Sequence, residues 1–279
     1  MMRLRRVVFG TLHLLLFMTL TLGGTALALD VQPTSDADVL AASVVKGAGV
    51  TIISASYVGA DGACGTYTGG PLGMPDGIIM TSGAALNALP PNSGGETSTE
   101  NGGGTDALCS QLTAPHAAND AARLDIVFDL APGFDGVDLQ YLFGSEEYPE
   151  YVGESYNDSV GIFVNGINVA LDSQGNTINI NGPFFSGTNV ITATETEYDG
   201  STPKLTNGAL LGPGEHTMTI VVCDAGDSSL DSGAFISLLG GCVGECDLIQ
   251  YCGDGLVSDF EACDDGNLEA GDGCDDACQ

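Results

Sequence analysis

Two short acidic runs hold the residues whose types and spacing are suited to chemistry. The first, FGSEEYPEYVGESYND, covers residues 143–158, and Pro149 and Gly153 prevent it from forming one continuous helix. The second, DAGDSSLDSG, covers residues 224–233. Carboxylates this concentrated repel one another unless a cation neutralises them or their pKa values rise. Calcium suits them because it binds about six to eight oxygen atoms in a relaxed geometry. The expected calcium ligands are Glu146, Glu147, Asp158, Asp224, Asp227 and Asp231.

Other roles for the same acids remain open. Asp, Asn and Ser commonly accept hydrogen bonds from backbone amides in turns, and neither run matches the EF-hand ligand pattern. Glu146 and Glu147 are also candidates for a glycosidase acid/base pair. Adjacent strand residues point to opposite faces, however, so this pair flanks one sugar bond only if the loop twists. No G-x-S-x-G elbow appears after the N-terminal leader. We therefore expect a protein that is not an enzyme.

Three tyrosines, Tyr148, Tyr151 and Tyr156, lie within the first acidic run. Tyrosine rings stack on sugars and anchor protein interfaces, although they also pack in cores. The alternative function is therefore a carbohydrate-binding, lectin-like module, or a carbohydrate-active enzyme that uses residues 143–158. Rings exposed beside the carboxylates would favour this alternative.

Charge excludes several kinds of partner. The chain has 37 Asp and Glu but six Lys and Arg, and three of those basic residues lie in the leader. Nucleic acids and anionic membrane surfaces need a basic surface, so neither is expected as a partner. The 41 Gly and 11 Pro argue against a mostly helical protein, and a hydrophobic content of 43% allows a core.

The first 28 residues have the pattern of a signal peptide. A basic start precedes an apolar run that ends in Ala26-Leu27-Ala28, the small-x-small pattern of a cleavage site. The run is shorter than a membrane-spanning helix needs. We expect a secreted or cell-surface protein that has no transmembrane anchor once the signal is removed.

The middle of the chain is predicted to be all-β. Residues 35–47 fit one short helix, with Asp36 among the capping residues. About ten short runs with strand patterns follow, and turn residues separate them, as in Leu124, Ile126, Phe128 and Leu130, which share a face. This pattern indicates a jelly-roll-like antiparallel β-sandwich over residues 29–241. Residues 90–107 are predicted to be a long surface loop.

The nine cysteines all follow the leader, which suits an oxidising destination. We expect a disulfide between Cys64 and Cys109 that ties down the loop. Cys223 is either a buried free thiol or the partner of Cys242. Residues 242–279 form a small disulfide-rich C-terminal module, in which Cys252, Cys263, Cys274 and Cys278 allow three connectivities.

The two acidic runs also carry a family resemblance. FGSEEYPEYVGESYNDSVGIFVNGINVAL and PGEHTMTIVVCDAGDSSLDSGAFI are similar to the bacterial extracellular choice-of-anchor L domain. The resemblance implies a β-rich domain of an exported surface protein. Members carry varied C-terminal sorting signals, and this chain shows none that we recognise.

The tail resembles a Cys-rich repeat of myxobacterial surface proteins, which has a CDDGN…GDGC core. Its acids form a weaker candidate calcium site, and the alternative is a disulfide-stapled spacer with turn-forming Asp and Gly. The candidate ligands in the tail are Asp264, Asp265, Asn267 and Asp272. Taken together, the sequence predicts a calcium-stabilised bacterial surface or secreted protein in adhesion, matrix or surface architecture, with a surface protein or polysaccharide as partner.

Overall fold

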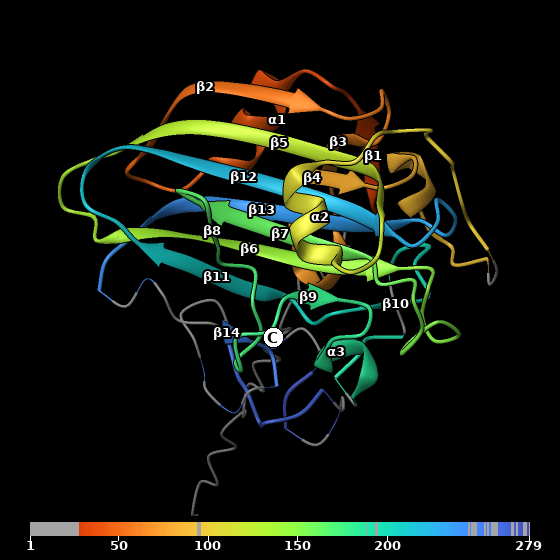
Figure 1. Cartoon of the computed structure of the whole chain (residues 1–279). Helices are drawn as coiled ribbons and strands as arrows, with labels where there is room; N and C mark the ends of the chain where they lie inside the picture. The colour runs from red at the N-terminus through yellow and green to blue at the C-terminus, as the bar shows by residue number, and fades with distance from the viewer. Residues whose placement is uncertain are drawn as a thin grey trace, which may run out of the picture.

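Two antiparallel β-sheets form a sandwich (Figure 1). The computed structural model describes residues 28–93, 96–187, 189–192, 195–244, 246, 250–253, 255, 257, 262–268, 271, 273–275 and 278. The predicted signal peptide therefore lies almost entirely outside the described residues. The predicted all-β class and antiparallel sandwich are confirmed.

The first sheet has eight described strands in the order β1-β3-β4-β13-β6-β11-β14, with β10 also paired to β6. Their bounds are β1 Asp30–Pro33, β3 Cys64–Thr68, β4 Asp76–Thr81, β6 Gly136–Ser145, β10 Gly200–Ser201, β11 Leu205–Leu210, β13 Ser232–Cys242 and β14 Gln250–Tyr251. The second sheet has six described strands in the order β2-β5-β12-β7-β8, with β9 also paired to β7. Their bounds are β2 Val50–Val58, β5 Ala118–Leu130, β7 Ser159–Val164, β8 Ile167–Asn168, β9 Ile178–Asn179 and β12 Gly214–Ala225.

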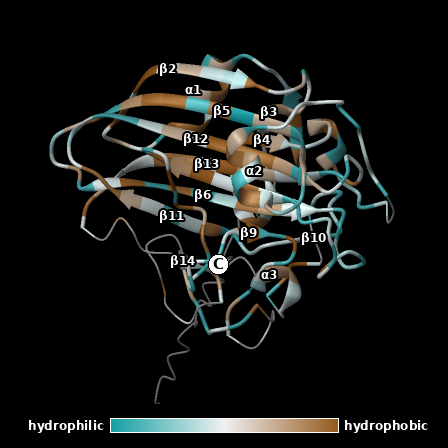
Figure 2. Ribbon diagram, in the orientation of Figure 1, coloured by the Kyte–Doolittle hydropathy of each residue, from teal (hydrophilic) through white to brown (hydrophobic). Residues whose placement is uncertain are grey.

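Alternation along the strands builds the core between the sheets. In β5, Leu124, Ile126, Phe128 and Leu130 are fully buried, whereas the residues between them are partly or fully exposed. These side chains meet those of the first sheet, such as Phe143, in one apolar cluster. Figure 2 shows hydrophobic residues along the central strands and hydrophilic residues in the connecting loops.

Short helices flank the sandwich. The predicted N-terminal helix is α1, Ala37–Val44, and Asp36 caps it by accepting hydrogen bonds from the amides of Asp38 and Val39. Two further helices were not predicted, α2 Ala107–Thr113 and α3 Pro183–Ser186. Two single 3-10 turns, η1 Pro71–Gly73 and η2 Ala85–Ala88, lie beside the first sheet.

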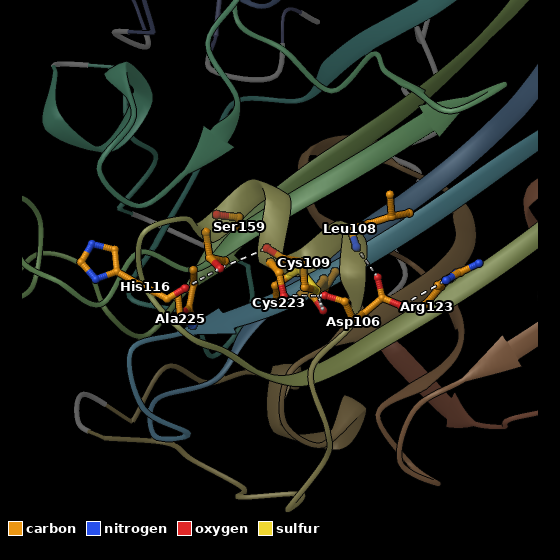
Figure 3. The surroundings of a disulfide bond; sticks show 12 residues. Asp106, Leu108, Cys109, His116, Arg123, Ser159, Cys223 and Ala225 are labelled. Carbon is orange, nitrogen blue, oxygen red and sulfur yellow. Dashed lines mark hydrogen bonds and ion pairs between the residues drawn. A yellow bond between two sulfur atoms is a disulfide. The ribbon is translucent and has the colours of Figure 1, made fainter.

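The predicted Cys64–Cys109 disulfide is wrong. Cys109 on α2 bonds to Cys223 on β12 (Figure 3), and Cys64 is a buried free thiol. The reason is the position of α2, which packs on the outer face of the second sheet, whereas Cys64 lies in the core on the first sheet. The second sheet therefore separates the two sulfurs. Both alternatives for Cys223 are also wrong, because Cys223 pairs with Cys109 and Cys242 pairs with Cys246.

The tail is attached to the sandwich and closed by two disulfides. Strand β14 pairs with β11, and Tyr251 packs edge-to-face on Phe184 with ring centroids 5.2 Å apart. Beyond it, Cys252 bonds to Cys278 and Cys263 bonds to Cys274. Of the three possible connectivities, the structure thus has the nested one.

Candidate functional site

The two acidic runs are connections between the sheets. The first leads from β6 in the first sheet to β7 in the second, and the second leads from β12 in the second sheet to β13 in the first. Ser145 at the end of β6 pairs with Ser232 at the start of β13, and Cys223 on β12 pairs with Ser159 at the start of β7. Both connections therefore lie at the same end of the sandwich, at the right in Figure 1.

Three of the predicted ligands are buried at this junction, and we call Glu147, Asp158 and Asp224 the inner cluster. Their exposed fractions are 2%, 0% and 2%. The amide of Ala225 donates to Asp158 Oδ1 at 2.9 Å. Within the described part of the chain, Glu147 Oε2, Asp158 Oδ2 and Asp224 Oδ1 are buried without a hydrogen-bond partner. Such atoms are rare in folded proteins, and each calls for a bound water, an ion or a proton.

Burial is the main cause of raised pKa values in the inner cluster. It raises the pKa of Glu147 to about 9, with smaller contributions from Asp158 and Asp227. Burial also raises the pKa values of Asp158 and Asp224, and the charged neighbours that raise them further are carboxylates. A proton or a cation is therefore needed to balance these groups.

The ion pairs among the described residues lie elsewhere. Lys46 pairs with Asp76, and Arg123 pairs with Asp106 at 3.1 Å and with Asp125 at 2.9 Å. None of these pairs includes an inner-cluster carboxylate. Where the structure is described, the inner cluster thus has no salt bridge to a basic side chain.

Two neighbouring cavities border the junction. The first, of about 320 Å³, is lined by Glu96, Ser98, Glu147, Tyr151, Tyr156, Asp227, Ser229 and Leu230. The second, of about 500 Å³, is lined by Glu96, Glu146, Tyr148, Pro149, Glu150, Tyr151, Thr192, Asp199 and Leu230. We call the second one the Glu146 cavity. Glu146 and Glu147 thus line different cavities and do not face one another across a single site.

Glu146 is as buried as the inner cluster. Its exposed fraction is 2%, and neither carboxylate oxygen has a hydrogen-bond partner among the described residues. Burial raises its pKa to about 8, and the neighbouring Asp199 adds to the shift. The amide of Thr97 lies near enough to lower this pKa in part, but it lacks the geometry of a hydrogen bond.

Asp231 has a different role from the other predicted ligands. Its carboxylate accepts hydrogen bonds from Asn87 Nδ2 at 2.7 Å, from the Thr99 amide at 2.8 Å and from the Ala84 amide at 3.4 Å. The contact from Thr99 holds the predicted surface loop, and those from Ala84 and Asn87 hold the segment that precedes it. Asp227 is exposed, and its Oδ1 accepts from the Ser229 amide at 3.0 Å.

Several acids that the sequence analysis did not single out also lie here. Glu197 accepts from the Ser93 amide at 2.9 Å and from Thr97 Oγ1 at 2.8 Å, so it also holds the loop. Glu96 and Asp199 line the cavities. Two of these acids, Glu197 and Asp199, belong to ETEYD, residues 195–199. The alternating acids of this segment resemble the other acidic runs and could have identified them.

The three predicted tyrosines are half-buried. Tyr151 and Tyr156 pack edge-to-face, with centroids 5.3 Å apart, and both line the first cavity. Tyr148 lies against Phe185 with centroids 6.1 Å apart and lines the Glu146 cavity. The rings are therefore beside the carboxylates, but Tyr151 and Tyr156 do not form one flat face.

The acids of the tail make turn contacts. Asp264 accepts from the amides of Gly253, Gly255 and Gly266. Asp265 accepts from Asn267 Nδ2 at 3.2 Å and from the Cys274 amide at 2.9 Å. These contacts favour the stapled-spacer alternative for this segment. Asp272 lies outside the described residues.

As the side chains stand, no three His, Cys, Asp or Glu residues in the described ranges are grouped closely enough to hold a metal ion. A cation at the junction would therefore require carboxylates to turn toward it.

The fold and its acidic junction define a β-sandwich domain with loop-based candidate sites. No described helix has the length and apolar composition to span a membrane. The chain belongs to the choice-of-anchor L domain family, whose model matches residues 30–239. This family indicates a bacterial surface-associated protein and is not a known enzyme family. No curated protein and no solved structure matches significantly. The family match ends before the tail, so the resemblance of the tail to a myxobacterial repeat stays a prediction.

Proposed function

We propose that this chain is an exported, non-enzymatic bacterial surface protein whose junction loops are ordered by calcium for adhesion, matrix or surface architecture. The observation that carries the calcium assignment is the inner cluster, where three buried carboxylates each leave an oxygen without a partner. The family supports the surface location.

Calcium suits the inner cluster better than other cations. Buried carboxylates bind hard cations through oxygen, and calcium accepts irregular geometry from loops, carbonyls and water. Asp227 lines the cavity that Glu147 also lines, so it is placed to add a ligand. Rotation of these side chains is required to bring their oxygens together around one ion, because they are not grouped for metal binding as they stand in the described residues. Binding would then replace the protons that the raised pKa values otherwise retain.

Thermal unfolding tests this proposal. The protein without its leader is unfolded with calcium or with EGTA, at one high ionic strength that already screens ordinary repulsion. Calcium should raise the midpoint by several degrees, and Asp224→Asn should abolish the rise, because ligand binding stabilises only the folded state. Asp129→Asn, at an exposed acid on β5, is the matched control and should keep the full rise.

The EGTA arm separates a lost site from a damaged fold. Asp224→Asn replaces a buried carboxyl group, whose pKa burial raises, with an amide that cannot ionise, so its midpoint in EGTA should equal or exceed that of the parent protein. An equal calcium rise in the parent and in Asp224→Asn would refute the assignment of the inner cluster.

A carbohydrate-binding function is the second candidate. It is favoured by the first cavity, which Tyr151 and Tyr156 line together with Glu147 and Asp227. Hydroxyl groups of a sugar can complete the shell of a bound calcium ion while a ring contacts tyrosine. Polysaccharide binding that requires calcium would distinguish this candidate from a purely architectural role. A glycosidase is disfavoured because Glu146 and Glu147 line separate cavities.

A further inference from the structure

Glu146 lines a different cavity from Glu147 and has different acidic neighbours. The Glu146 amide donates to the Asp231 carbonyl at 3.1 Å, and the Glu147 amide donates to Ser145 Oγ at 3.0 Å. Both residues follow the end of β6, and their side chains line different cavities. An ion bound by the inner cluster therefore leaves the Glu146 carboxylate without a balancing charge.

The surroundings of Glu146 supply negative charge and no hydrogen-bond donor of good geometry. Both of its oxygens are buried and without a partner, in the part of the chain that the structure describes. The charged groups near it are Asp199, Glu197 and Asp231. Burial of an unbalanced carboxylate is strongly unfavourable. These orphaned oxygens, beyond the presence of acids alone, point to a cationic ligand.

The acids near Glu146 differ in whether their oxygens already accept hydrogen bonds from the loop. Asp231 and Glu197 already accept hydrogen bonds from the loop, so they are poor candidates. Asp199 lines the Glu146 cavity, and Asn92 Nδ2 donates to its Oδ1 at 2.8 Å. Its second oxygen, Oδ2, is therefore the atom that we assign as the ligand. Thr192 lines the same cavity and adds a hydroxyl oxygen.

We propose that Glu146 and Asp199 form a second divalent-cation site, separate from the inner cluster, with Thr192 and water completing the oxygen shell. Calcium is the expected ion, since the ligands are hard oxygens and the cavity of about 500 Å³ has room for water. This inference deepens the proposed function and rests on it, because both ions would order the same junction.

The two sites share a wall. Glu96, Tyr151 and Leu230 line both cavities, so one ion would lie on each side of these residues. The second site would offer two carboxylates where the inner cluster offers three, so it should bind calcium more weakly.

Counting bound ions tests the inference. Equilibrium dialysis of the leader-free protein against calcium should give two ions per chain. Glu146→Gln should give one ion, with second-site affinity reduced at least about tenfold. Asp224→Asn should lose the other ion, which the inner cluster binds more tightly. Glu154→Gln, at an exposed glutamate of the same loop, is the matched control and should retain both ions.

Terbium offers an independent readout. The chain has no Trp, so terbium luminescence must be excited through tyrosine, and Tyr151 lines both cavities. Glu146→Gln should remove one phase of a two-phase titration. If Glu146→Gln does not fold, Asp199→Asn takes its place with the same expectation.

Each outcome decides between the two sites. One ion in the parent protein, unaffected by Glu146→Gln and lost in Asp224→Asn, would overturn the second site and leave the first. Two ions in both the parent and Glu146→Gln would overturn the assignment of Glu146. No bound ion in the parent would overturn both the second site and the calcium part of the proposed function.

Discussion

Cys64 is the one cysteine outside the four disulfides, all nine cysteines being among the described residues. It is fully buried on β3, and its Sγ donates to the Thr34 carbonyl at 3.0 Å. Burial raises the pKa of this thiol to about 11. The thiolate is the reactive form of cysteine, so Cys64 should be inert in the folded protein.

A thiol count checks this residue. Ellman's reagent at about pH 8 should detect no thiol in the native protein, because Cys64 is both inaccessible and protonated. In denaturant without reductant it should detect one thiol. Three thiols in denaturant would mean that one of the four disulfides is open, contrary to the structure.

The cysteine pairing shows what single residues could not reveal from sequence. The positions of the cysteines can be read from the sequence, but a disulfide also requires that its two Cα atoms lie about 4.4–6.8 Å apart. Cys109 and Cys223 satisfy this at 5.5 Å because α2 lies on the outer face of β12. The helix itself was missed, since ALCSQLT is short and its cap, Asp106, lies at the end of a stretch without periodicity.

At the scale of elements, α2 is joined to the second sheet at two points. Asp106 accepts from the Leu108 amide at 2.7 Å and pairs with Arg123 on β5, and the disulfide adds a covalent link to β12 (Figure 3). The closed loop is long, with a sequence separation of 114 residues. Cross-links that close long loops remove more entropy from the unfolded chain.

Removing this disulfide should therefore destabilise the protein. The double variant Cys109→Ala/Cys223→Ala should lower the free energy of unfolding by about 2–5 kcal/mol, measured by urea denaturation. Cys242→Ala/Cys246→Ala is the control, because those residues are separated by 4 positions and close a small loop. Equal losses in the two variants would contradict the loop-entropy explanation.

The junction loops give the calcium-free protein a characteristic pH dependence. Glutamates in the unfolded chain lose their protons near the ordinary pKa of 4.5, whereas the folded chain retains those of Glu146 and Glu147 up to about pH 8 and 9. Between these values the folded state binds more protons. The free energy of unfolding therefore falls as the pH rises.

Urea denaturation in EGTA should thus show lower stability at about pH 8 than at about pH 6. Glu146→Gln/Glu147→Gln should flatten the difference, since neither amide titrates. Calcium should restore most of the loss at the higher pH by replacing the released protons. A stability in EGTA that rises over this interval would show that these carboxylates are ionised at little cost in the folded state.

Strand elements were predictable where alternation was strong. Residues 124–130 were expected as a half-buried strand, and they form the second half of β5. β3 and β11 were missed because CGTYT and LTNGAL contain small and polar residues, which become buried through packing against neighbouring strands. The local pattern cannot report such tertiary burial.

For the whole molecule, composition predicted the class of protein better than the details of the site. The acidic balance of 37 Asp and Glu against six basic residues pointed to cations, and the acidic runs do meet at one end of the sandwich. Their meeting depends on strand pairing across two sheets, which residue types do not encode locally. The engagement of Asp231 with the loop and the separation of Glu146 from Glu147 also follow from that arrangement.

The sheet order has a mechanical consequence. Strands β1 and β14 occupy opposite edges of the first sheet. A force applied between β1 and β14 would act across the first sheet, perpendicular to its strands. The hydrogen bonds between neighbouring strands would then break one after another, while the second sheet would carry little of the force. The two acidic connections join the central strands β6 and β13 to the second sheet. Ions bound there would therefore strengthen the first sheet at its centre against this force.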